Sequence, residues 1–417
     1  MKFKNIWSIS VSMLVGIGTT IPVIATTSCA KTSSWTIMIY LCGSNLESRF
    51  GFATLNLSEI KDSSFGSNIN VLVETGGANQ WHTEAHGLPT VSTQKNERWQ
   101  FKNHQMQKIL TLTSNNMGDE ETLEDFIRWG TTDYVTQHYA LIVWDHGSGV
   151  FGAEQDGITG DMLSMLNIHD ALAHGINQNH LHNDKFDFID FDCCLMADIE
   201  TQWMLSPFAN YLVLSEDTEP GIGQNYHWLN YLNSNSDKPV LSITKDIVDT
   251  YIDKVKNYNS THKSSDAATL SVSRTDTIES LIQNFNAWIN VVLSNDDALN
   301  VIKSYFREYY YNQQYEGPYC DLYFMAKTLI NTPSVAKETN DLLKSITNFI
   351  VYDSESDKQL QANSHGLSIF LSNSVWVSSN EYTFEQYINV INSWPEDLKA
   401  PFQKYINLIN LLAVIEI

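Results

Sequence analysis

Residues 186–196 read Phe-Asp-Phe-Ile-Asp-Phe-Asp-Cys-Cys-Leu-Met, and this stretch decides the fold. The segment from Phe186 to Phe191 predicts a buried strand that ends at Asp192-Cys193-Cys194. A helix is predicted to follow, from about Ala197 to Leu205. Cys194 is therefore expected at a strand-to-helix junction, where the dipole and free N–H groups of a helix N-terminus lower the pKa of a thiol.

The same pattern of a strand followed by a helix recurs on both sides of this stretch. The other predicted strands are Trp35–Leu41, Asn68–Thr75, Tyr139–Trp144 and Tyr211–Leu214. Helices are predicted at 51–61, 119–129 and 167–177, and residues 88–113 alternate as a β-hairpin does. Strands that alternate with helices imply parallel pairing with right-handed crossovers. The sequence thus predicts an α/β fold with a mainly parallel central sheet flanked by helices.

A second, mostly helical region follows a segment rich in Asn and Ser at 230–238, which marks the expected boundary. We therefore expect a catalytic region at 35–235 and a C-terminal region at 236–417 that completes the fold. The helical patterns lie at 243–258, 276–294, 297–311, 319–351 and 382–412. Short strands are predicted at 268–273 and 366–371.

The composition narrows the class of protein. The 417 residues include 25 Lys+Arg and 48 Asp+Glu, which gives a formal net charge of −23. Because such an acidic chain repels phosphate backbones, nucleic acid is not an expected partner. Apolar residues make up 43% of the chain, enough for a folded core. The five cysteines are too few and too scattered for a disulfide scaffold, and they lack paired zinc-ligand spacing.

The first 28 residues have the layout of a secretory signal peptide. Lys2 and Lys4 precede an apolar, small-residue stretch from Ile6 to Ala25. Cys29 follows, as in a bacterial lipobox, and residues 29–34 are then a lipid-anchored tether. The expected location is the extracellular face of the cell membrane. An uncleaved membrane anchor and a plain signal peptide cut nearby are the alternatives.

Candidate chemistry gathers at the carboxyl ends of three predicted strands, where open α/β sheets bind ligands. These ends read Asp145-His146-Gly147, Asp192-Cys193-Cys194 and Ser215-Glu216. A cysteine and a histidine at neighbouring strand ends suit nucleophilic acyl transfer, in which the Cys194 thiolate attacks a carbonyl and His146 transfers protons. Backbone N–H groups of Gly147 and Cys194 would stabilise the oxyanion. The alternative is a packing thiol and an ordinary loop histidine.

Three segments, at 141–149 (LIVWDHGSG), 186–200 (FDFIDFDCCLMADIE) and 211–223 (YLVLSEDTEPGIG), resemble the clostripain-type cysteine peptidases, which are relatives of caspases. The resemblance implies a caspase-like α/β sandwich and a Cys-His dyad that hydrolyses peptide bonds of protein or peptide substrates. It assigns the histidine to His146. It assigns the nucleophile, in an Asp-x-Cys-Leu-Met context, to Cys194.

Cys193 is the alternative nucleophile. Neighbouring side chains along a strand point to opposite faces, so we expect Cys193 and Cys194 to diverge and only one of them to face His146. Only Cys194 has the flanking context of the family. A vicinal disulfide between the two would be strained and would inactivate the enzyme reversibly.

The resemblance also implies cleavage after Arg or Lys, which acidic residues of the S1 pocket recognise. Asp192 matches one such position, whereas Ile222 occupies the other. Ser215 and Glu216 are further candidate substrate-binding residues. The acids that lie close enough to replace the missing one are Glu216, Asp217 and Glu219.

No cofactor is expected for this chemistry. The resemblance makes Ca²⁺ conceivable, with Asp156 and Asp161 as candidate ligands, although turn residues explain this loop equally well. No metal site is predicted from the other histidines (His169, His174, His180 and His182), which lack the i, i+4 spacing with an acid. A second function class stays open: a lipoprotein on a lapsed peptidase scaffold that acts as an adhesin or partner-binding module.

Overall fold

The computed structural model describes residues 34–176, 181, 184–312, 318–357, 363–372 and 382–413. The predicted signal peptide, Cys29, His180 and His182 lie outside these ranges. Within them, a nine-stranded sheet has the order β12-β10-β9-β8-β5-β1-β2-β3-β4. Its strands are β1 (Trp35–Cys42), β2 (Ile69–Gly76), β3 (Glu97–Lys102), β4 (Gln105–Thr111), β5 (His138–Trp144), β8 (Phe186–Asp192), β9 (Ala209–Leu214), β10 (Thr269–Arg274) and β12 (Ile350–Glu355).

The five central strands are parallel, and both ends of the sheet are antiparallel. β2, β1, β5, β8 and β9 pair in parallel, as the alternation of strands and helices predicts. The β3–β4 hairpin closes one end, while β10 and β12 close the other. Two small sheets pair β6 (Ala153–Gln155) with β7 (Met162–Leu163) and β11 (Tyr319–Asp321) with β13 (Ser368–Phe370).

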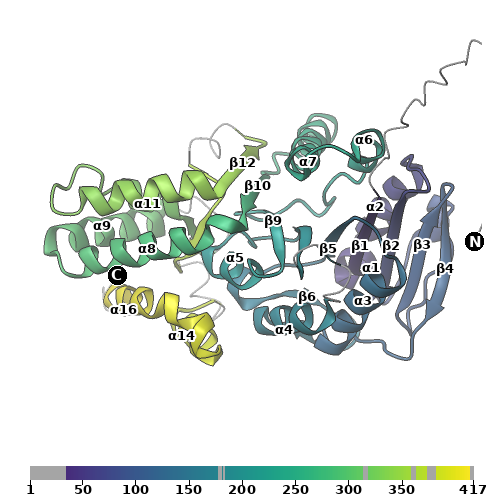
Figure 1. Cartoon of the computed structure of the whole chain (residues 1–417), viewed down its shortest axis with the longest axis horizontal. Helices are drawn as coiled ribbons and strands as arrows, with labels where there is room; N and C mark the ends of the chain where they lie inside the picture. Colours follow the sequence, from purple (N-terminus) through teal and green to yellow (C-terminus); the bar gives the residue numbers. More distant parts are fainter. Residues whose placement is uncertain are drawn as a thin grey trace, which may run out of the picture. The chain divides into compact units, whose positions relative to one another are not determined.

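Helices cover both faces of the sheet (Figure 1), because the side chains of its strands are apolar on both sides. In β1, Ile37 and Ile39 point to one core, and Met38 and Tyr40 to the other. The first core includes α2 (Phe52–Asp62), α6 (Trp228–Asn235) and α7 (Val240–His262), and α1 (Ser44–Phe50) precedes α2. The second includes α3 (Glu120–Asp133), α4 (Met165–Gly175) and α5 (Ile199–Leu205).

The remaining helices follow β10 and extend the second core. They are α8 (Ile278–Leu293), α9 (Asp296–Asn312), α10 (Leu322–Lys327), α11 (Ala336–Phe349), α14 (Phe384–Ser393), α15 (Glu396–Lys399) and α16 (Gln403–Ala413). α8 packs against α11 and α16. The described residues from 34 onward form one compact unit, and residues 230–235, where composition suggests a boundary, lie in α6.

Three local predictions differ from the structure. The pattern over residues 319–351 predicts only helix, yet this segment begins in β11 and ends in β12. A strand of three residues is too short to show a hydrophobic period, and α11 contributes most of the residues in the segment. The helix predicted at 51–61 is α2, which begins one residue later because Gly51 has a φ of +72°, and α1 before it was not predicted. α5 begins at Ile199, since the Asp198 carboxylate caps it by accepting a hydrogen bond from the Thr201 N–H (2.8 Å).

Candidate active site

The register between β5 and β8 brings the two predicted motifs together. Trp144 lies opposite Asp192, so the residues that follow both strands leave the same edge of the sheet. Gly147 shows how closely they approach: a Cβ added there would lie 2.2 Å from the carbonyl oxygen of Cys194. Only glycine fits this contact, and the loop that carries His146 is thereby packed against the backbone of Cys194.

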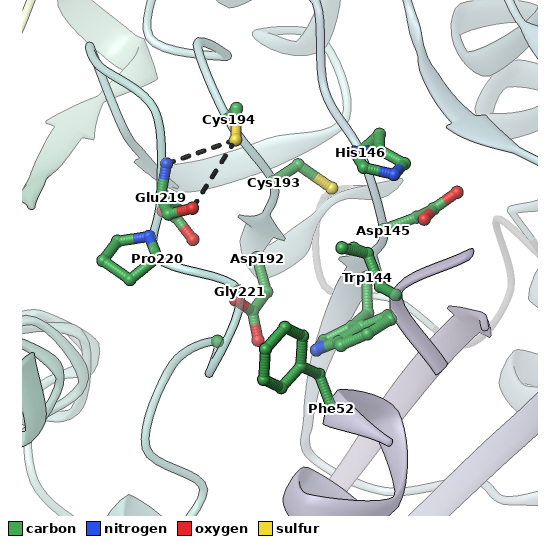
Figure 2. Close-up of a pocket in the computed structure, with 12 residues that line it drawn as sticks. Phe52, Trp144, Asp145, His146, Asp192, Cys193, Cys194, Glu219, Pro220 and Gly221 are labelled. Atoms are coloured by element: carbon green, nitrogen blue, oxygen red, sulfur yellow. Dashed lines mark hydrogen bonds between the residues drawn. The ribbon is translucent and has the colours of Figure 1, made fainter. Parts of the chain in front are cut away.

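A cavity of about 270 Å³ opens at this edge (Figure 2). His146 and Cys194 both line it, as predicted, together with Asp192. Its other lining residues are Leu46, Phe52, Trp144, Asp145, Cys193, Glu219, Pro220, Gly221 and Gly223. The fold therefore places the predicted nucleophile, the predicted base and one predicted specificity residue around one space.

The thiol of Cys194 is held by the loop after β9. It accepts a hydrogen bond from the Glu219 N–H at 3.2 Å, and its side chain is partly buried. Burial raises the pKa of Cys194 to about 11. The expectation of a lowered pKa is thus wrong for this conformation, because α5 begins five residues later and Asp198, rather than the thiol, caps its N-terminus.

The imidazole of His146 is oriented by Asn45, which sequence reasoning missed. Nε2 of His146 lies 2.8 Å from Oδ1 of Asn45. Because a carbonyl oxygen only accepts, Nε2 carries the proton and Nδ1 remains free to act as a base. Burial lowers the pKa of His146, which favours the neutral ring. The sequence could have indicated this contact, because Asn45 lies just beyond the end of β1, which is the strand next to β5.

Cys193 and Cys194 diverge, as the alternation along a strand predicts. Cys193 is fully buried, and its thiol donates to the carbonyl of Val143 at 3.5 Å. In Figure 2 its side chain projects on the side of His146, whereas the Cys194 thiol is directed to Glu219. Both are free thiols, so no vicinal disulfide is formed. The next residue, Leu195, has a φ of +66°, which marks a tight turn directly after the cysteines.

Asp192 and Glu219 form an acidic wall of the cavity. Asp192 accepts hydrogen bonds from the Tyr226 hydroxyl (3.0 Å) and the Gln224 N–H (2.9 Å), and burial raises its pKa to about 6. Glu219 lies against it, and its pKa is raised by burial and then by the Asp192 charge.

Three predicted substrate-binding residues do not line the cavity. The Ser215 hydroxyl pairs with Thr269 of β10 (3.0 Å), and Ile222 is buried in the core beside α2 and α7. Glu216 turns away to accept a hydrogen bond from the Gly366 N–H (2.8 Å) and lies beside Asp321. Among the acids considered as replacements, Glu219 is the one that lines the cavity.

The two candidate Ca²⁺ ligands are occupied by hydrogen bonds. The Asp156 carboxylate accepts from the N–H groups of Met117, Ile158 and Thr159, at 2.7–2.9 Å. Asp161 accepts from the Asn116 side chain at 2.7 Å. These hydrogen bonds are those of turn residues, the interpretation that the sequence favours, and a Ca²⁺ site in this loop stays a prediction.

Comparisons with known proteins identify the family of this chain. The model of the clostripain family matches residues 39–403. Clostripain from Hathewaya histolytica is 24% identical over 318 residues, which cover 64% of this chain and 59% of clostripain. This chain thus spans less than two thirds of the length of that relative.

Two solved structures share the fold. A secreted C11 cysteine protease from Bacteroides thetaiotaomicron, in complex with an irreversible peptide inhibitor, has a TM-score of 0.58 at 20% identity, over 78% of this chain and 85% of that one. An inactive zymogen C11 protease from Parabacteroides distasonis has a TM-score of 0.59 at 17% identity, over 89% of this chain and 98% of that one.

The α/β fold, with a cysteine and a histidine at neighbouring strand ends, is that of a cysteine peptidase scaffold. Because the family model covers most of the chain, this protein belongs to the clostripain family. The resemblance drawn from the three sequence segments is confirmed.

Proposed function

We propose that this protein is a cysteine endopeptidase in which Cys194 is the nucleophile and His146 the general acid and base. One observation carries the proposal: both residues line a single cavity that also has an acidic wall. Nδ1 of His146 takes the thiol proton as the sulfur attacks the scissile carbonyl, and returns a proton to the leaving amine. Asn45 keeps the ring in the tautomer that this exchange needs.

Two backbone donors are suited to stabilise the oxyanion. Among the described residues, the N–H groups of Gly147 and Cys194 donate no hydrogen bond to another residue. Their neighbours are used in the backbone: Ser148 donates to Gly152, and Leu195 donates to Asp217. Gly147 packs directly against Cys194, which supports the assignment of these two unused donors to the oxyanion of the tetrahedral intermediate.

The acidic wall supports specificity for Arg or Lys at P1. Asp192 and Glu219 supply the negative charge, and the rings of Phe52 and Trp144 line the same space, so that they can pack against the aliphatic part of a long basic side chain. Glu219 takes the place of the acid that the resemblance assigned to position 222. A cationic substrate would also draw the Glu219 carboxylate toward itself and release the thiol that the Glu219 N–H holds.

We further propose that the protein is lipid-anchored through Cys29 at the extracellular face of the cell membrane. The basic and apolar residues before Cys29 support this location. In the described part of the chain, none of the helices has the length and apolar character needed to span a bilayer. Protein and peptide substrates outside the cell would then be within reach.

A panel of fluorogenic peptides that differ only at P1 tests the activity. We expect turnover with Arg and Lys, loss of turnover in Cys194→Ala, and retention in Cys193→Ala. Unchanged turnover in Cys194→Ala would overturn the assignment of the nucleophile. No turnover on any peptide would instead favour a lapsed peptidase that binds partners. Metabolic labelling with a palmitate analogue, compared between the native chain and Cys29→Ser, tests the anchor.

A further inference from the structure

A second group of reactive side chains lies behind the catalytic loop. Cys42 ends β1, Asp145 follows β5, and Glu154 lies in β6. The Sγ of Cys42 and one carboxylate oxygen of each acid lie within 4.8 Å of one another. Cys42 and Glu154 are 0% exposed and Asp145 is 4% exposed. In Figure 2 the Asp145 carboxylate points away from the Cys194 thiol, although Asp145 itself also lines the substrate cavity.

Glu154 is the unexplained member of this cluster. Neither of its carboxylate oxygens forms a hydrogen bond of good geometry, although both are buried and the backbone N–H groups of Trp144 and Cys42 lie nearby. One oxygen of Asp145 accepts from the Ser44 hydroxyl at 2.5 Å, and the carboxyl also interacts with the Cys42 thiol. Its Oδ2 has no partner of good geometry. Buried polar groups are normally paired, because an unpaired one loses its hydration without compensation.

No basic side chain balances the two acids. Among the described residues, the ion pairs involve neither Asp145 nor Glu154. Two carboxyls and a thiol thus lie buried together, with three carboxylate oxygens that have no hydrogen-bond partner of good geometry. A bound cation would neutralise these groups and give the oxygens a partner.

From this cluster we infer that Cys42, Asp145 and Glu154 bind a divalent metal ion of borderline softness, such as Zn²⁺. Three donors within 4.8 Å of one another leave a point at most about 2.8 Å from each, and small side-chain rotations bring this to the 2.0–2.3 Å of Zn–O and Zn–S bonds. The thiolate favours Zn²⁺ over Ca²⁺ or Mg²⁺, which take oxygen ligands. On binding, the thiol and any protonated carboxyl release their protons to solvent.

The three ligands come from three separate elements, so the ion would tie β1, β5 and β6 together. Asp145 directly precedes His146, and Ser44, whose hydroxyl contacts Asp145, directly precedes Asn45. The ion would thus fix the backbone on both sides of the His146–Asn45 hydrogen bond. This role is structural, and it does not depend on whether the chain cleaves peptides.

Metal content measured without any activity readout tests the inference. The full chain carrying Cys194→Ala is purified without chelator, so that metal at the catalytic thiol is not counted, and is analysed by mass spectrometry of the elements. We expect about one zinc per chain, and a higher melting temperature when Zn²⁺ is returned to the chelator-treated protein. Cys42→Ser and Glu154→Gln should each lower the Zn²⁺ affinity by about 10–100-fold or more.

Matched controls separate the site from general destabilisation. Cys320→Ser removes a buried thiol, and Glu200→Gln a buried acid, both outside the cluster, so each should keep its zinc. Cys42→Asp should shift the preference from Zn²⁺ toward Mn²⁺, because all donors are then oxygen. If the parent chain contains no metal and its melting temperature does not respond to Zn²⁺, Mn²⁺ or Ca²⁺, the inference is wrong. Zinc retained in full by folded Cys42→Ser and Glu154→Gln would overturn it equally.

Discussion

The main-chain N–H of Glu219 lies 3.2 Å from the Sγ of Cys194, so the residue that supplies charge to the substrate cavity also covers the nucleophile. The two roles are linked because Glu219 lies on one short loop after β9. In this conformation the Glu219 N–H covers the thiol. If the proposed function holds, binding of a basic side chain beside the Glu219 carboxylate would expose the thiol, and chemistry and specificity would be coupled through one residue.

The protection of Cys194 predicts slow alkylation at neutral pH. Its pKa is raised to about 11 by burial, and the thiolate is the reactive form. The rate of labelling by iodoacetamide should therefore rise about tenfold per pH unit between pH 7 and 10. The measurement uses the Cys29→Ser variant, so that labelling reports Cys194: Cys42, Cys193 and Cys320 are buried. The same variant carrying Cys194→Ala is the blank. A rate that is already maximal at pH 7 would contradict the prediction.

Glu219 should decide the preference for basic substrates. In Glu219→Gln we expect kcat/KM for P1 Arg to fall by about 10–100-fold, since a buried ionic contact to a charged group contributes roughly 1.5–3 kcal/mol. The value for an uncharged P1 residue should change much less. Glu216→Gln is the matched control, because its carboxylate is buried against Gly366 instead of the cavity. Equal losses for Arg and Ala at P1 would argue for a structural role of Glu219.

Asn45 is predicted to position His146 without contacting the substrate. Asn45→Ala should lower kcat by about tenfold and leave KM nearly unchanged, because the imidazole loses the acceptor that fixes its tautomer. Asn45→Asp keeps an acceptor oxygen at the same place and should recover part of the loss. Steady-state kinetics on one P1 Arg peptide measure all three proteins. An increase in KM alone would indicate that Asn45 binds substrate instead.

Sequence patterns predicted the central sheet and the shared edge at which Cys194 and His146 lie, because both depend on local signals. Continuous apolar strands such as Tyr139–Trp144 can be recognised without their partners, and the polar residues after them fall at one sheet edge. The role of Glu219 depends on how a loop folds back over Cys194, which no local pattern records. The same holds for Glu216: its position beside Asp321 results from the packing of β11, a strand of three residues.

The buried acids predict that the protein is more stable in mildly acidic solution. Burial raises the pKa of Glu74 and of Glu200 to about 7, so the folded state binds protons that the unfolded chain releases above about pH 4.5. This contribution is fully present below the unfolded pKa and is lost as the pH rises through 7. The melting temperature should therefore fall between pH 5 and pH 8. In Glu200→Gln the difference in unfolding free energy between pH 5 and pH 8 should shrink by on the order of 1–3 kcal/mol.

The chain is predicted not to cleave itself: it stays in one piece when active or is cut by another enzyme. Autolysis after a basic residue between the two catalytic motifs requires a Lys or Arg there, and none occurs between Arg128 and Lys185. Lys185 itself is held, since its ammonium donates to the carbonyl of Ser206 at 2.8 Å and it directly precedes β8. Purified active protein should therefore run as a single band, and mass spectrometry should find no terminus within 150–186. Fragments with such a terminus at a position other than Lys185, in the active chain but not in Cys194→Ala, would show that self-cleavage occurs after a residue other than Arg or Lys. In that case the acidic wall of Asp192 and Glu219 would not be the basis of substrate choice.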